Sequence, residues 1–349
     1  MHTAITQRQG EELVVHVETL PSETAQAFKD GLDAFIVQYN LSDAQGETAK
    51  DKILSVFGEE NAQDAIFSAV VNYLVPFALH EQNILPLSTY NIEAESELKD
   101  GEAFSFSMTV LPRPSFELSS YEPVEVEVPR VGEVSESDIE QQLQMLAHQF
   151  AHMSQPDAAE EELDVPEITD EWVKNHFQMS DIDSVEALRE QLRIVSQQEL
   201  VARSDEMKME AIMQAWFPRF TGEVSQKMLD AMTEELFETF QSQLAQENTT
   251  LEDFLSEQHM TEENVRSSLM AQANNQLIQG FILDAVFKHE NLSLELPDLM
   301  AAVRGIAPGR EEETLDALEK SGRSFLLRES ASRLKAAGWL LKNSTIKEV

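Results

Sequence analysis

The chain has 349 residues and a formal net charge of −39, from 64 acidic and 25 basic residues. Its hydrophobic content of 42% is enough for a buried core, whereas the excess of carboxylates argues against direct nucleic-acid binding and against an anionic membrane surface. The absence of Cys excludes disulfides, thiolate nucleophiles and Cys-based metal sites.

The N-terminus, MHTAITQRQGEELVV, has no basic start followed by an apolar run, so no secretory signal is expected. No apolar stretch approaches the ~20 residues that span a bilayer. We therefore expect a cytoplasmic protein that does not associate with membranes.

The first 130 residues predict mixed α and β structure. LVVHVETL at 13–20 predicts a strand, and Pro21 and Ser22 open a helix with an apolar face. A polar loop at 40–49 precedes a second helical region, in which Pro76 is a candidate kink.

Strict alternation in FSFSMTV at 104–110 predicts a half-buried strand, which pairs with a strand candidate around Ile92. The Asp100-Gly101 pair between them is typical of a hairpin turn. Val124, Val126 and Val128 then form a half-exposed extended segment.

From about Ser135 the pattern is almost wholly helical. Ser135 and Asp138 have the spacing of a capping box, and SQPDAAEEELD at 154–164 predicts a solvated linker. Apolar residues recur every four positions from Val265 to Phe281 on the helix expected at 262–290. Helices are expected at about 184–216, 223–246, 250–258, 262–290, 297–304, 310–320 and 323–341.

Three segments resemble trigger factor, the bacterial ribosome-associated chaperone family. They are PRPSFELSSYEPVEVEVP at 112–129, VPEITDEWVKNHF at 165–177 with DSVEALREQLR at 183–193, and TTLEDFLSEQHMTEENVRSSL at 249–269. In the family, an FKBP-type prolyl isomerase domain lies between the first two. Here only the acidic stretch separates the flanks of that domain, so the resemblance implies a shortened form without isomerase activity.

The resemblance implies an α+β N-terminal domain followed by an elongated all-α C-terminal domain of the SurA and trigger factor type. The expected boundaries are a ribosome-binding-type domain at 1–130, a helical linker with the acidic loop at 131–164, and a helical chaperone domain at 165–349.

The family's ribosome-docking loop has the pattern Gly-Phe-Arg-x-Gly-Lys-x-Pro. Its Phe, Arg and Lys are replaced here by Asp43, Ala44 and Glu47, so the loop loses two positive charges and gains two carboxylates that repel phosphates. The sequence therefore argues against ribosome docking by this loop, which could simply be a polar connection between two helices. The aligned positions are Ser42, Asp43, Ala44, Gln45, Gly46, Glu47, Thr48 and Ala49, of which only Gly46 matches.

Met and aromatic residues are densest near position 210. Flexible Met beside aromatic side chains suits promiscuous apolar binding, although a stripe of this kind is also typical of ordinary core. The candidate client-binding residues are Met207, Met209, Met213, Trp216, Phe217 and Phe220, with Phe237 and Phe240 on the next expected helix.

No catalytic residue, metal or cofactor is predicted. His148 and His152 have a metal-compatible spacing but no third ligand, and a solvated helix face explains them better. The sequence favours an ATP-independent chaperone for unfolded or nascent polypeptides. Two alternatives remain: a peptidyl-prolyl isomerase, as a family-level activity, and a dedicated assembly protein with a single client.

Overall fold

A computed structural model describes residues 1–88, 90–155, 164–177 and 182–349. The chain forms two compact units, each built from two separate segments. Residues 1–122 and 216–339 make the first unit, and residues 123–215 and 340–349 make the second. The predicted boundaries at 130 and 164 stay a prediction.

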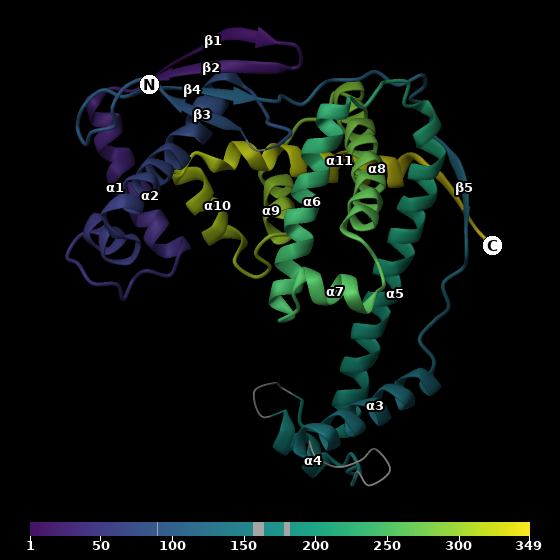
Figure 1. Ribbon diagram of the computed structural model, residues 1–349. Coiled ribbons are helices and arrows are strands. Elements are labelled where there is room, and N and C mark those ends of the chain that lie inside the picture. Colours follow the sequence, from purple (N-terminus) through teal and green to yellow (C-terminus); the bar gives the residue numbers. More distant parts are fainter. Residues whose placement is uncertain (89, 156–163, 178–181) are drawn as a thin grey trace. The chain divides into compact units, whose positions relative to one another are not determined.

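An antiparallel sheet in the order β1-β2-β4-β3 begins the first unit (Figure 1). In register, Val15 faces Met108 and Val17 faces Phe106, and all four side chains are buried in the core. The predicted turn is present, with Gly101 at φ +71°. The strands are β1 (His2–Gln9), β2 (Glu12–Glu18), β3 (Asn91–Ala94) and β4 (Ser105–Val110).

Helices α1 (Pro21–Gln38) and α2 (Ala49–Gln82) bury their apolar faces in the same core as the sheet. The backbone of α2 leaves helical geometry at Gly58, where φ is +74°, and not at Pro76, which is buried inside the helix. Among the described residues, α2 is the one helix long and apolar enough for a bilayer span. Its apolar side chains are instead core residues of this unit.

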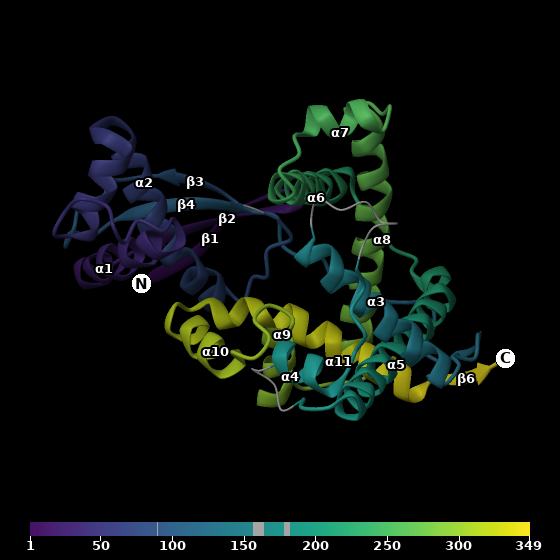
Figure 2. The same cartoon turned by 90° about the horizontal axis from the view of Figure 1, so that it is seen from below.

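The second segment of the first unit is helical. Helices α6 (Gln226–Gln246) and α8 (Glu262–His289) pack against each other, with α7 (Leu251–Glu257) at their tip (Figures 1 and 2). In the predicted stripe of α8, Val265, Ala273, Leu277 and Phe281 are buried. The remaining helices are α9 (Leu296–Arg304), α10 (Glu311–Lys320) and α11 (Leu327–Asn343).

The two segments of this unit share their cores. Phe325, from the short 3₁₀ turn η3 (Arg323–Leu326), is 3% exposed and lies in the cluster formed by the sheet, α1 and α2. Leu87 and Leu111 are likewise buried in one cluster with Phe281 of α8. The unit therefore depends on contacts between residues about 200 positions apart.

The second unit is mostly helical. Strand β5 (Glu125–Val128) pairs in parallel with β6 (Thr345–Glu348), a pairing that the sequence did not predict. Apart from β6, the described chain after residue 130 consists of helices and their connections. The predicted α+β region followed by a helical region is therefore confirmed. The helices are α3 (Glu136–Ser154), α4 (Asp170–His176) and α5 (Val185–Trp216).

The predicted capping box at the start of α3 is present, since Asp138 N–H donates to Ser135 Oγ at 3.2 Å and Ser135 N–H donates to Asp138 Oδ2 at 2.8 Å. The core of this unit joins Ile139 and Leu143 of α3 to Val173 of α4 and Leu188 of α5. Most of the predicted acidic linker, residues 156–163, lies outside the described residues.

Candidate functional site

The long helix α5 presents apolar side chains to solvent. Ile194, Val195 and Val201 are 43%, 38% and 51% exposed, and Met207 and Met209 are half-buried. With about 100° of rotation per helical residue, Ile194, Val195, Val201 and Met209 lie on one side of α5 and form what we call the α5 surface, whereas Met207 lies on the other side. Exposed β-branched and Met side chains on one helix can make weak apolar contacts with many different chains.

Three of the predicted client-binding residues belong to the core instead. Met213 and Phe237 are each 4% exposed and Trp216 is fully buried. The Arg219 guanidinium lies 4.3 Å from the centre of the Trp216 ring. Side chains this deeply buried stabilise the folded state and offer no surface to a ligand.

Two of the other predicted aromatic residues are half-buried and pack against another ring. Phe220 packs edge-on against Phe116 at 5.0 Å, and Phe240 packs edge-on against Phe254 at 5.1 Å. Phe217 is also half-buried. Because Met207, Met209 and Met213 belong to the second unit and the five aromatic residues to the first, the structure does not assign all eight to one patch.

An aromatic cluster in the second unit was not predicted from the sequence. Phe150 of α3 packs edge-on against Trp172 of α4 at 5.0 Å, and His176 stacks on Trp172 at 4.2 Å. A shallow pocket of about 380 Å³ lies beside these rings, and Met153, which is 73% exposed, lines it. The helical spacing of Phe150 from the apolar residues before it predicts a helix. It cannot indicate that Trp172, 22 positions further along the chain, packs against Phe150.

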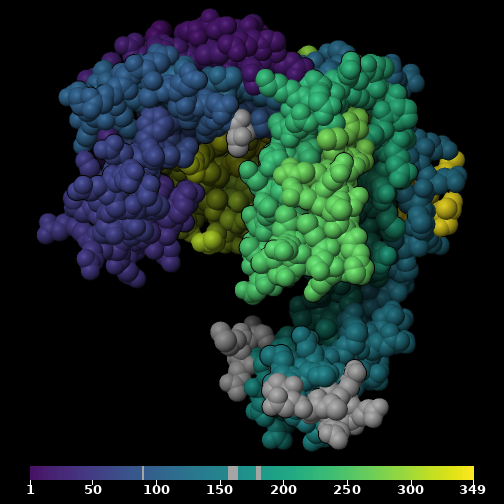
Figure 3. Space-filling view, viewed as in Figure 1, coloured from purple at the N-terminus to yellow at the C-terminus, as the bar shows by residue number. Residues whose placement is uncertain are grey.

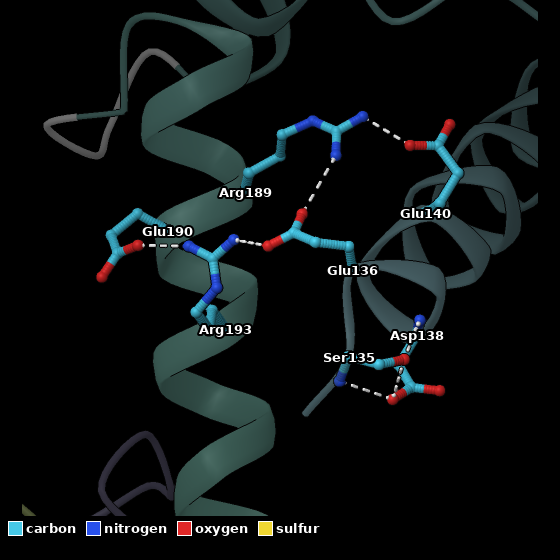
Figure 4. A network of polar contacts seen from close by, with 7 residues as sticks. All are labelled: Ser135, Glu136, Asp138, Glu140, Arg189, Glu190 and Arg193. Atoms are coloured by element: carbon cyan, nitrogen blue, oxygen red, sulfur yellow. Dashed lines mark hydrogen bonds and ion pairs between the residues drawn. The ribbon is translucent and has the colours of Figure 1, made fainter. Parts of the chain in front are cut away.

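A polar network holds α3 and α5 together (Figure 4). Arg193 donates to Glu136 at 2.6 Å, and Arg189 pairs with both Glu136 and Glu140. These side chains are partly exposed, so each pair contributes little free energy of unfolding. Together with the apolar core, the network fixes how the two helices lie against each other.

The loop at 42–49, which the sequence aligns with the family's docking pattern, folds back on the start of α2. Thr48 Oγ1 accepts a hydrogen bond from Asp51 N–H at 3.2 Å, and Lys52 Nζ donates to the Ser42 carbonyl oxygen. Gly46 has φ +139°, and a Cβ there would lie 2.5 Å from the Asp51 Cβ, so this position requires Gly. Asp43 and Glu47 are exposed.

No group of three or more metal-ligating side chains occurs among the residues that the structure describes. His148 and His152 are exposed on α3. This placement agrees with a solvated helix face.

Comparison with known proteins gives two family matches. Residues 1–146 match the model for bacterial trigger factor protein, and residues 184–342 match the model for its C-terminus. Trigger factor from Streptomyces avermitilis is 33% identical over 145 residues, which is 40% of this chain and 31% of that protein. Trigger factor from Geobacter sulfurreducens is 27% identical over 150 residues, which is 43% of this chain and 33% of that protein.

Trigger factor from Pelotomaculum thermopropionicum is 23% identical over 189 residues, which is 53% of this chain and 42% of that protein. The chain thus spans about a third to two-fifths of the length of these curated relatives. This chain also aligns with a solved structure described as showing promiscuous substrate recognition in the folding and assembly activities of the trigger factor chaperone. The alignment covers 98% of this chain and 99% of that chain, at 16% identity and a TM-score of 0.40.

Proposed function

Because the chain belongs to the trigger factor family, we propose that it is a molecular chaperone that binds unfolded or nascent polypeptides without ATP. The observation that carries this proposal is the pair of family matches, to residues 1–146 and 184–342. The exposed α5 surface supports it. We place the protein in the cytoplasm.

The proposed mechanism is competition. An unfolded chain that makes several weak apolar contacts with the α5 surface is less available for collapse and aggregation with other chains. The net charge of −39 keeps such a complex soluble because like-charged particles repel each other. This mechanism requires neither catalytic chemistry nor a cofactor.

Prolyl isomerase activity is not part of the proposal. The two family matches are separated only by residues 147–183, and the described part of that stretch consists of the end of α3, α4 and their connections. An isomerase domain of the FKBP type needs a sheet and an aromatic-lined pocket, for which roughly a hundred residues are required.

Dilution of a chemically denatured client into buffer is expected to produce less light scattering when this protein is present in several-fold excess, with no ATP added. Ile194→Ser with Val201→Ser should reduce the suppression by about twofold, because apolar area available to the client is lost. The matched control is Ile306→Ser with Leu334→Ser, which changes two side chains of similar exposure in the first unit.

Equal scattering with and without the unaltered protein would rule out the proposed function. Equal losses in both double variants would mean that the α5 surface has no special role. The same preparations should leave the isomerisation of an X-Pro test peptide unchanged. Acceleration that persists through purification would instead favour the isomerase.

We expect this protein to co-sediment poorly with ribosomes, since Asp43 and Glu47 repel RNA. Restoring the family pattern with Asp43→Phe, Ala44→Arg and Glu47→Lys should increase binding at least about tenfold at low salt and make it steeply salt-dependent. The control is Asp316→Phe, Ala317→Arg and Glu319→Lys, the same change of charge on exposed positions of α10. Tight, salt-sensitive binding by the unaltered protein would contradict the prediction.

A further inference from the structure

Two imidazoles on the surface of α3 have the spacing of metal ligands. His148 and His152 are one helical turn apart, so at about 100° of rotation per residue their side chains leave the helix only about 40° apart. Both are exposed, and the structure gives neither ring a hydrogen bond or an ion pair with another described residue. By contrast, His16 pairs with Glu95 at 2.9 Å. The two rings on α3 can therefore turn toward one ion.

The helix surface around these rings carries no charge. Residues 141–155 contain no Asp, Glu, Lys or Arg, although the whole chain has 64 acidic residues and a net charge of −39. Gln141 and Met145 lie on the same side of α3 as the two His residues, and Met145 is 64% exposed. The teal surface around α3 and α4 is seen from outside in Figure 3. A second copy of this acidic chain would meet no carboxylate of this stretch, so repulsion between the copies is weakest here.

One chain supplies only half of a zinc site. A closed Zn²⁺ site has four ligands in a tetrahedron, and its His nitrogens lie at about 2.0–2.1 Å from the ion. No third metal-ligating side chain joins this pair within the described residues, and the chain has no Cys. Two neutral imidazoles from each of two copies would complete the tetrahedron. They would leave the positive charge of the ion in place, which offsets part of the repulsion between two acidic chains.

We propose that His148 and His152 bind Zn²⁺ together with the same two residues of a second copy, so that the ion joins two chains through their α3 helices. A twofold arrangement completes the site because each copy presents the same pair of ligands. His152 lies in the last turn of α3, where the helix dipole favours a cation. The inference is independent of the proposed chaperone function, because it concerns a metal site and a dimer rather than the binding of clients.

Sedimentation velocity of the full chain tests the proposal. Addition of Zn²⁺ is expected to convert a species that sediments more slowly in EDTA into a dimer, and excess EDTA should reverse the change. Isothermal titration with Zn²⁺ should give one ion for every two chains at this site. Mg²⁺ and Ca²⁺ should not promote the dimer, because these hard cations prefer oxygen ligands to imidazole.

His148→Ala and His152→Ala should each weaken the zinc-dependent dimer at least about tenfold, because each removes two of the four ligands from the joint site. The matched control is His2→Ala, which removes an exposed His from the first unit and should dimerise as the unaltered protein does. Circular dichroism should show that the two α3 variants keep their helical content, since both substituted side chains are exposed and Ala favours a helix.

The absence of a zinc-dependent dimer would overturn the inference, as would a zinc-dependent dimer of equal strength in the His148→Ala and His152→Ala variants. Binding of one ion per monomer by these residues would also overturn it, because the site would then be completed within one chain. Suppression of aggregation is measured separately in EDTA, so its failure would count against the proposed function and not against the metal site.

Discussion

Trp216→Ala is expected to lower the free energy of unfolding by about 3–5 kcal/mol, the usual cost of removing a large aromatic side chain from a packed core. The reason is that Trp216 is fully buried, at the point where α5 ends and η2 (Phe217–Arg219) begins. A shift of the denaturant midpoint, followed by circular dichroism, measures this cost. Phe217→Ala, which truncates the half-buried neighbour, should cost less, about 1 kcal/mol.

This comparison separates a structural role from a client-binding role. At a temperature where the Trp216→Ala variant is still folded, it should suppress aggregation as well as the unaltered protein does. If the Trp216→Ala variant keeps its unfolding midpoint but no longer suppresses aggregation, Trp216 contacts clients directly. The structural role inferred from its burial would then be wrong.

The elements that the sequence predicts well are those whose signal is local. FSFSMTV at 104–110 alternates strictly, and β4 buries the expected face. The helix expected at 262–290 was observed at Glu262–His289, because Thr261 caps it and an apolar stripe follows. Strand β1 was not predicted because seven of its eight side chains are exposed or half-exposed without alternation.

Non-local pairings could not be predicted. Strand β6 pairs with β5 so that Thr345 lies beside Glu125, and nothing within either short segment indicates a partner so distant in sequence. The pairing depends on the folded chain rather than on local composition.

The candidate client surface was only partly predictable for the same reason. Met209 and Trp216 both occur at helical spacing on α5, yet one is half-buried and the other fully buried. Periodicity identifies an apolar face but does not indicate whether another element covers it. The aromatic cluster of Phe150 and Trp172 requires α3 and α4 to pack together, which the intervening acidic stretch gives no reason to expect.

Arg333→Met is expected to destabilise the protein by about 3 kcal/mol, which corresponds to a fall of roughly 6–12 °C in Tm for a unit of this size. Arg333 of α11 forms a bidentate pair with Asp284 of α8, at 2.9 Å and 2.7 Å, and also donates to Glu329 at 2.6 Å. Arg113 pairs with the same Glu329 oxygen at 2.7 Å. Burial raises the pKa of Glu329 despite these two cations, so this carboxylate is already costly to ionise in the folded state.

Removing Arg333 leaves Asp284 without its bidentate partner and Glu329 with Arg113 alone, in a setting where all four side chains are at most 29% exposed. Asp284→Asn added to Arg333→Met should therefore recover part of the lost Tm, because it removes the uncompensated charge. The control is Arg304→Met, which breaks the exposed pair with Glu311 and should leave Tm unchanged within error. If thermal melts show the same Tm for Arg333→Met and Arg304→Met, the partly buried charge cluster does not stabilise the contact between α8 and α11.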